Sequence, residues 1–311
     1  MQRGSADRIH DWICWGVIVA ALFVQGAAGW ILANKRHRPD YYLDIIVNAA
    51  PRFAPPYWKL VVSCLATSTV LGASLSRRCR ARMRMRPLHE RPSVRGRMYL
   101  EAVAVPFVIS AALLSGLLAA YTYPPKFPMG TLLMAVLVLL SLRNPLAIGY
   151  AFARCRSVLV PLAEWGWRRG RGIWRELLIG ACFGLVVFPL RFIPGEALRA
   201  DDSGLIPISA VVLALLSSVV WAPIVEETVC RGMLYRYLRD HLRWPLAVLV
   251  SAALFAVMHR SLAAFPCHFI SGVTFALLRE WRGSLLAPVA AHATINLAAG
   301  LATIDRIAWL L

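Results

Sequence analysis

The sequence has few charged residues, and its cysteines show no spacing that indicates pairing. Charged side chains make up 16% of the 311 residues, whereas 59% are hydrophobic. A soluble domain of this size would not carry so many long apolar runs. The seven cysteines are scattered along the chain, and none forms a Cys-x-x-Cys pair. This pattern excludes a disulfide framework and a thiolate zinc site.

Several short catalytic motifs are absent as well. The chain contains no His-Glu-x-x-His zinc motif, no Gly-x-Ser-x-Gly nucleophile turn and no phosphate-binding loop. No motif therefore indicates a zinc metalloprotease, a serine hydrolase of the nucleophile-turn type or a phosphate-loop nucleotide-binding protein.

Long apolar segments dominate the chain. A membrane-spanning helix needs about 20 predominantly apolar residues, and in lipid its backbone must satisfy its own hydrogen bonds. We therefore predict an all-α, polytopic integral membrane helical bundle with about eight or nine transmembrane helices. The first run extends to Ala33, which is longer than a signal-peptide core and favours a first span. The predicted segments are 12–33, 57–76, 99–121, 129–142, 177–193, 206–225, 244–259, 266–278 and 284–303.

The net charge of +18 comes almost entirely from arginine, and it is concentrated in loops. Two arginine runs, Arg77–Arg97 and Arg154–Arg175, lie between apolar segments and are predicted to be cytoplasmic. The first run could also contact anionic lipid headgroups. No soluble basic domain is present, so a nucleic-acid partner is not expected. We predict a multi-pass protein of the cell membrane, most consistent with a prokaryotic plasma or inner membrane. Arg36 and Arg38 fall outside in this scheme, which leaves the N-terminal topology open.

The sequence divides into three parts by its polar content. Residues 1–175 are predicted to be N-terminal transmembrane helices with arginine-rich cytoplasmic loops. Residues 176–303 contain the polar groups that lie in apolar surroundings, and we predict that they form the catalytic helical core. Residues 304–311 form a short C-terminal tail. No internal repeat is visible.

Two adjacent carboxylates, Glu226 and Glu227, lie at the end of an apolar segment. Carboxylates at membrane depth are costly and usually serve a function. Glu227 and Arg231 are four residues apart, with the acid first, which is the favourable ion-pair geometry on a helix. Glu226 points about 100° away from Glu227 and is free for another role. The alternative is a salt-bridged cluster at a helix end.

His259 closes the next apolar segment, in the pattern Phe-x-x-x-His. The turn between the two helices centres on residues 240–243. Glu226 and His259 each lie roughly 25 Å from this turn at 1.5 Å per residue. An antiparallel hairpin would bring them to the same depth, where a carboxylate and an imidazole can activate water. The alternative is an ordinary histidine at a helix end.

His292 and Asn296 share one face of the last apolar segment because they are four residues apart. Both side chains can donate hydrogen bonds, which suits stabilisation of a developing oxyanion. The alternative is that they bond only to neighbouring helices. His268 lies at the start of the preceding helix and is expected to be structural.

The order Glu-Glu-x-x-x-Arg, Phe-x-x-x-His and His-x-x-x-Asn resembles the CPBP family. This family contains the type II CAAX prenyl endopeptidases and their bacteriocin-processing relatives, and is also called the Abi family. The resemblance covers roughly residues 176–300. It implies an intramembrane endopeptidase in which Glu226 and His259 activate water. His292 and Asn296 would form the oxyanion site, and Glu227 and Arg231 would hold its geometry.

The resemblance also implies a substrate class. Expected substrates are membrane-associated or hydrophobic peptides and proteins, including lipidated ones and C-terminal anchors. The glutamate mechanism needs no metal or other cofactor, although the same groups could bind zinc. One alternative is a non-catalytic binding, immunity or scaffold protein of the same fold. Another is a transporter with a proton relay, which predicts paired halves that the sequence does not show.

Overall fold

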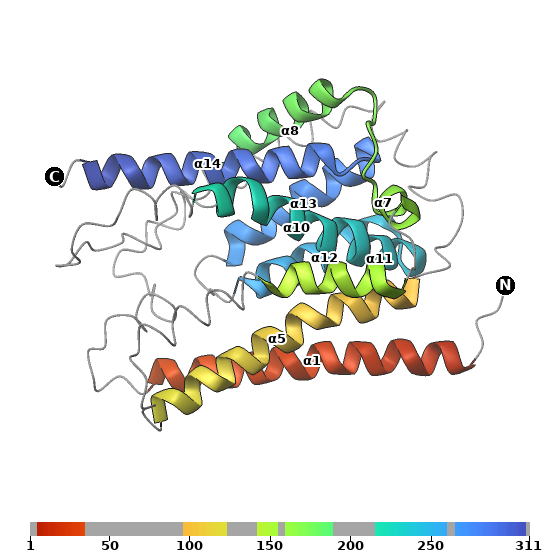
Figure 1. Ribbon diagram of the computed structural model, residues 1–311, viewed down its shortest axis with the longest axis vertical. Helices are drawn as coiled ribbons and strands as arrows, with labels where there is room; N and C mark the ends of the chain where they lie inside the picture. The colour runs from red at the N-terminus through yellow and green to blue at the C-terminus, as the bar shows by residue number, and fades with distance from the viewer. Residues whose placement is uncertain are drawn as a thin grey trace. The chain divides into compact units, whose positions relative to one another are not determined.

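The computed structural model of the protein describes residues 5–34, 96–122, 142–154, 159–188, 215–259 and 265–308 (Figure 1). These residues are helical, with short turns and no strands among them, so the predicted all-α class is confirmed for them. The predicted apolar segment 57–76 lies outside the described residues. The same is true of most of segment 129–142 and of the first arginine run up to residue 95.

Most of the described helices overlap the predicted apolar segments, but residues 142–154 and 159–165 are helical outside them, and the segment 206–225 continues as helix to His241. Residues 142–154 are helical in addition to the named elements. The elements, in chain order, are α1 (Ser5–Asn34), α5 (Gly96–Thr122), α7 (Leu159–Trp165), α8 (Ile173–Val187), the π-helix η2 (Ser217–Trp221), α10 (Ala222–Glu227), the π-helix η3 (Thr228–Leu234), α11 (Tyr235–His241), α12 (Trp244–Met258), α13 (Phe265–Arg282) and α14 (Leu286–Ala308).

Two of the described helices are long and apolar enough to cross a membrane. The qualifying stretches are Ile9–Ala27 in α1 and Met98–Gly116 in α5. Trp244–Met258 and Leu286–Leu301 are apolar but shorter. The described helices therefore do not confirm the predicted count of eight or nine transmembrane helices.

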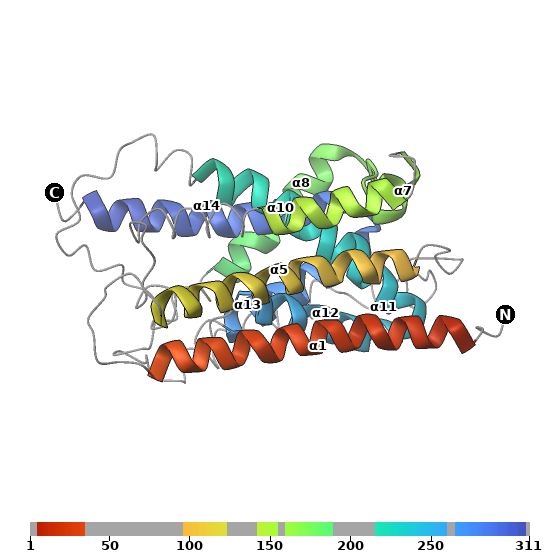
Figure 2. The ribbon, with the colours of Figure 1, turned by 60° about the horizontal axis from the view of Figure 1, so that its bottom comes forward.

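The chain forms two compact units. The first comprises Met1–Asn48 and Val94–Pro161, and the second comprises Ala49–Ser93 and Leu162–Leu311. In the first unit α1 lies alongside α5 (Figures 1 and 2). The second unit contains all of the predicted site residues. The boundaries of the parts 1–175, 176–303 and 304–311 stay a prediction.

Glu101 of α5 organises the polar contacts of the first unit. Its carboxylate lies 2.7 Å from His10 Nε2 of α1 and accepts a hydrogen bond of 2.5 Å from the Tyr150 hydroxyl. Arg154 Nε lies 3.7 Å from the same carboxylate. A partly buried acid in an apolar helix pair needs such partners, so Glu101 has a structural explanation within this unit.

Two glycines allow α8 to approach α14 closely in the second unit. Gly180 and Gly184 form a Gly-x-x-x-Gly pattern, which brings helix backbones together. A Cβ on Gly180 would collide with the Ala287 carbonyl, and a Cβ on Gly184 would lie 2.6 Å from the Ala291 carbonyl. Both carbonyls belong to α14 and lie five residues and one residue before His292. Both ribbon views show the two helices side by side (Figures 1 and 2).

Replacing Gly184 by leucine is expected to destabilise the second unit because the side chain must displace the α14 backbone. Overpacking of this kind costs about 1–3 kcal/mol or more. Thermal unfolding in detergent should show a lower transition temperature for Gly184→Leu. The matched control is Gly116→Leu in α5, where a Cβ meets nothing within 4 Å. Equal unfolding temperatures for the two variants would contradict the close α8–α14 contact.

Candidate active site

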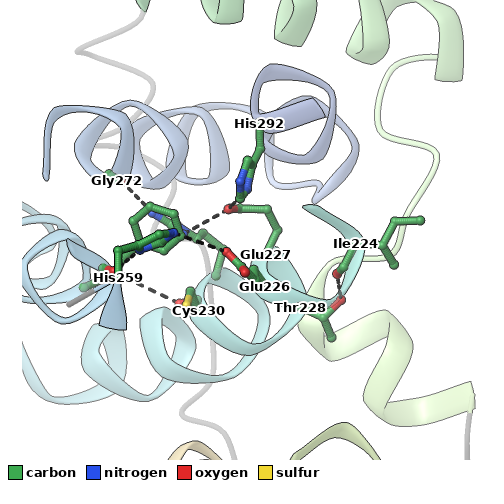
Figure 3. A network of polar contacts seen from close by, with 11 residues as sticks. Ile224, Glu226, Glu227, Thr228, Cys230, His259, Gly272 and His292 are labelled. Atoms are coloured by element: carbon green, nitrogen blue, oxygen red, sulfur yellow. Dashed lines mark hydrogen bonds and ion pairs between the residues drawn. The ribbon is translucent and has the colours of Figure 1, made fainter. Parts of the chain in front are cut away.

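The Glu227 carboxylate lies at the centre of the site and is completely buried. Its Oε1 accepts a hydrogen bond of 3.0 Å from Arg231 Nη1, as the four-residue spacing predicts. The same oxygen lies 3.1 Å from His292 Nδ1 of α14 (Figure 3). Because a buried carboxylate must be compensated, this one atom joins the α10–η3 segment to α14.

Arg231 is itself fully buried and connects a third helix to this network. Its Nη2 donates a hydrogen bond of 2.9 Å to the Gly272 carbonyl of α13. The guanidinium carbon lies 4.4 Å from the ring centroid of Phe255 and 5.2 Å from that of Phe275. These aromatic faces stabilise a desolvated cation. Arg231 therefore holds Glu227 in place and fixes α12, α13 and η3 against each other.

Glu226 and His259 form a second carboxylate–imidazole pair, which is more open. Glu226 Oε2 lies 3.9 Å from His259 Nε2, and the side chains are 15% and 22% exposed. The hairpin spacing predicted that these residues meet, and the structure confirms that proximity (Figure 3). One acid of the pair Glu226–Glu227 is thus sealed in the core, and the other is accessible.

The hydrogen bonding of His259 defines which ring nitrogen faces Glu226. Nδ1 lies 2.8 Å from the Phe255 carbonyl, so Nδ1 carries the proton and donates it. In the neutral ring, Nε2 is then an acceptor and faces a carboxylate that is also an acceptor. Their separation of 3.9 Å is too long for a direct hydrogen bond. A water molecule between them can donate one hydrogen to each.

Phe255 separates and orients the imidazoles of the site. Its ring centroid lies 4.7 Å from that of His259 and 5.8 Å from that of His292. His268 of α13 stacks on His259 at 3.9 Å, and Phe275 stacks on His292 at 5.0 Å. In the sequence, Phe255 is notable only as the first residue of the Phe-x-x-x-His motif. The sequence assigned His268 a structural role, whereas the structure places that ring against a predicted catalytic histidine.

Asn296 shares a face of α14 with His292, and its amide contacts a different helix. Asn296 Nδ2 donates a hydrogen bond of 2.7 Å to the Ser218 carbonyl of η2. The other amide hydrogen is not used by this bond. The structure thus anchors Asn296 to the segment that precedes Glu226, while His292 binds Glu227.

Pro223 explains why the Ser218 carbonyl needs an outside donor. In η2 the Ala222 N–H bonds to the Ser217 carbonyl, five residues earlier. The next residue in that pattern is Pro223, which has no N–H to offer Ser218. Such an orphaned carbonyl must find another partner, and Asn296 supplies it. π-helical segments often occur at functional sites, and this one lies a single turn before Glu226.

A loop that precedes the predicted core also supports the site. Trp167 Nε1 lies 3.2 Å from Thr228 Oγ1, directly after Glu227. Thr228 in turn donates a hydrogen bond of 2.6 Å to the Ile224 carbonyl. Gly232 leaves room for the Trp165 side chain, which would lie 2.9 Å from a Cβ there. No periodic signal in the sequence could have found these contacts, because they join the loop to a helix 61 residues later.

The described part of the chain holds no group of three or more His, Cys, Asp or Glu side chains arranged for a metal ion. Carboxylate and imidazole are nevertheless zinc ligands.

The structure thus defines an all-helical protein with two carboxylate–imidazole pairs gathered among its helices. Residues 207–298 match the family model described as type II CAAX prenyl endopeptidase Rce1-like. This segment contains all three motifs, so the resemblance to that family is confirmed there. The family is one of membrane-embedded proteases. No curated protein and no solved structure matches the chain.

The link between Pro223 and Asn296 can be tested by a double-mutant cycle. Asn296→Ala leaves the Ser218 carbonyl without its donor and should cost about 1–3 kcal/mol of unfolding free energy. Pro223→Ala restores a backbone N–H to this turn. Asn296→Ala should therefore cost clearly less in the Pro223→Ala background. Chemical denaturation of the four proteins measures the coupling, and purely additive effects would contradict it.

Proposed function

We propose that the protein is an intramembrane endopeptidase that hydrolyses a peptide bond of a membrane-associated or hydrophobic peptide or protein. The observation that carries this proposal is the pair Glu226 and His259. Their acceptor atoms face each other at a distance that fits one bridging water, and both remain partly exposed. The pair lies within the segment that matches a protease family.

In the proposed reaction, the bridging water attacks the carbonyl carbon of the scissile peptide bond. The pair Glu226–His259 accepts the proton that the water loses as its oxygen forms the new bond. The tetrahedral intermediate then collapses and breaks the C–N bond. The same pair returns the proton to the nitrogen of the leaving amine, which gives a carboxylic acid and an amine. Transfer of the remaining carboxyl proton to the amine yields a carboxylate and an ammonium ion, and the residues end in their starting states.

His292 and Asn296 are proposed to stabilise the oxyanion of that intermediate. His292 Nδ1 is engaged by Glu227, so its Nε2 can donate only when the ring carries both protons. The carboxylate of Glu227 is in place to balance that charge. Asn296 would use the amide hydrogen that Ser218 does not take. Glu227 and Arg231 hold the geometry, and preorganised donors of this kind are a large source of rate enhancement.

The proposed setting is a cell membrane, with the chain crossing it several times. The family match and the two membrane-length helices support this placement. Partners are then the lipid bilayer and the peptide or protein substrate, which can be lipidated or a C-terminal membrane anchor. Lipid-embedded substrates suit a site whose water-accessible acid lies among apolar helices.

A non-catalytic role is the second candidate. The fully buried network of Glu227, Arg231 and His292 would stabilise a binding or immunity protein just as well. It does not require the accessible pair Glu226–His259, however, and that pair is the feature that favours catalysis. The two candidates differ in whether Glu226 is needed for function.

Glu226→Gln should abolish proteolysis because the amide cannot accept the proton from water. Loss of a general base lowers rates by about 10²–10⁴-fold. Peptides from membranes and medium of cells that carry the wild type or the variant should be compared by mass spectrometry. New peptide termini should appear with the wild type and with the control Asp240→Asn, which changes an acid at the end of α11. Identical peptides for wild type and folded Glu226→Gln would support the non-catalytic role.

Removal of divalent metal should leave the proposed activity unchanged, because the Glu226–His259 pair activates water without a metal. The purified protein should be treated with a zinc chelator, dialysed and assayed on a peptide identified in the preceding comparison. A loss of activity that zinc restores would contradict a mechanism in which Glu226 and His259 activate water without a metal. Zinc content measured before and after chelation provides the control.

A further inference from the structure

A basic and aromatic loop lies at the start of α8, outside the site. We define this loop as residues 166–175. Its arginines Arg168, Arg169, Arg171 and Arg175 are all exposed. Trp174, at its end, is 83% exposed. The hydrophobic effect disfavours such exposure of tryptophan in water, so the loop fits a partner that is both anionic and apolar.

The outer face of α8 indicates what that partner is. Leu178 and Leu185 are 66% and 58% exposed on this helix. The distance from Trp174 to Leu185 is roughly 16 Å at 1.5 Å per residue. Exposed leucines, then Trp174, then the arginines at 168, 169 and 171 follow the order of hydrocarbon, interface and headgroup in a bilayer, and Arg175 lies beside the tryptophan at the interface. This order places those three arginines at the level of the lipid phosphates.

Charge complementarity selects anionic lipid over neutral lipid. The loop presents four arginines, whose planar guanidinium groups bind phosphate oxygens in pairs. The acid that follows, Glu176, is buried and paired with Arg282 at 2.5 and 2.7 Å. A single buried acid therefore faces a loop that carries four arginines, and the loop keeps a net positive charge. A surface of this charge attracts the anionic headgroups of a leaflet.

The loop is fixed to the core rather than loosely attached. The Gly166 carbonyl accepts a hydrogen bond of 2.9 Å from the Leu285 N–H, and the Arg168 carbonyl accepts one of 2.7 Å from Ser284 Oγ. Both donors belong to the turn between α13 and α14. Gly166 has a φ of +100°, and the Arg279 guanidinium occupies the space where its Cβ would be. These contacts join the loop backbone to the core, so a displacement of the loop also acts on the core.

Trp167 is the direct contact between this loop and the site. It lies next to Arg168 in the chain, and its indole nitrogen contacts Thr228 Oγ1 at 3.2 Å. Thr228 follows Glu227 at the point where α10 changes to the π-helix η3. The rotation of this segment about its axis decides where both Glu226 and Glu227 point.

We propose that the loop 166–175 is a docking surface for anionic phospholipid headgroups, and that Trp167 couples lipid docking to the segment carrying Glu226 and Glu227. Lipid binding at the loop stands by itself. Only the effect on catalysis rests on the proposed function.

The test uses the full chain reconstituted in vesicles of phosphatidylcholine alone or mixed with phosphatidylglycerol. Hydrogen–deuterium exchange of residues 166–175 and 224–234 is measured in both. Anionic lipid should slow exchange in both segments for the wild type, and high salt should reduce the effect. Each arginine near an anionic surface contributes about fivefold to association. Arg169→Gln with Arg175→Gln should therefore lose most of the difference in the loop.

Two further variants separate docking from coupling. Arg154→Gln with Arg243→Gln removes two exposed arginines elsewhere and should keep the wild-type response. Trp167→Phe keeps the loop arginines, so anionic lipid should still slow exchange at 166–175 but no longer at 224–234. An unchanged lipid effect at 224–234 in this variant would overturn the coupling. Equal exchange of wild-type 166–175 in both lipids would overturn the docking surface.

The effect of lipid on catalysis is measured separately, as the cleavage rate in each vesicle composition. If the endopeptidase proposal holds, anionic lipid should raise the cleavage rate of the wild type, and the loop double variant should lose this rise. Lipid-dependent exchange without any cleavage would refute the endopeptidase and leave the docking surface standing. Cleavage at equal rates in both lipids, with lipid-dependent exchange at 166–175, would refute the coupling to catalysis alone.

Discussion

The buried carboxylate of Glu227 is the constraint on which the rest of the site depends. A carboxylate removed from water must be paired, and this one is paired through Oε1 with both Arg231 and His292. The two bonds fix the rotation of the α10–η3 segment and of α14. Once α14 is fixed, Asn296 faces the Ser218 carbonyl four residues further along. Removing Arg231 would leave the buried carboxylate without its cation, which explains why Glu227 and Arg231 occur together.

The two adjacent acids have different roles, one structural and one chemical. Glu227 is sealed and makes the network rigid, whereas Glu226 keeps access to water and faces His259. A general base has to reach its water, so a fully buried acid could not fill this role. A fully exposed one would not be held at a fixed distance from its imidazole. The helix rotation of about 100° between neighbours gives one segment both environments.

Much of the fold and part of the site could be predicted from spacing alone. Apolar run length predicted the helices, and the four-residue spacing predicted the Glu227–Arg231 pair, because both depend on local geometry. The Glu226–His259 contact followed from two helices of equal length around one turn. The π-helical segments could not be predicted in this way. The link between η2 and α14 could not either, because Pro223 lacks the N–H for the Ser218 carbonyl and Asn296, from a distant helix, supplies a donor instead.

The sequence by itself determined the all-helical class, the apolar segments and the order of the three motifs, because helix formation and side-chain spacing are local properties. Only the tertiary structure decided which groups meet. It placed Phe255 between the imidazoles, stacked His268 on His259 and brought Trp167 to Thr228. These contacts join residues on different helices or loops, and packing between elements has no periodic signature along the chain. The sequence therefore names the reactive groups, and the packing sets their distances and their access to water.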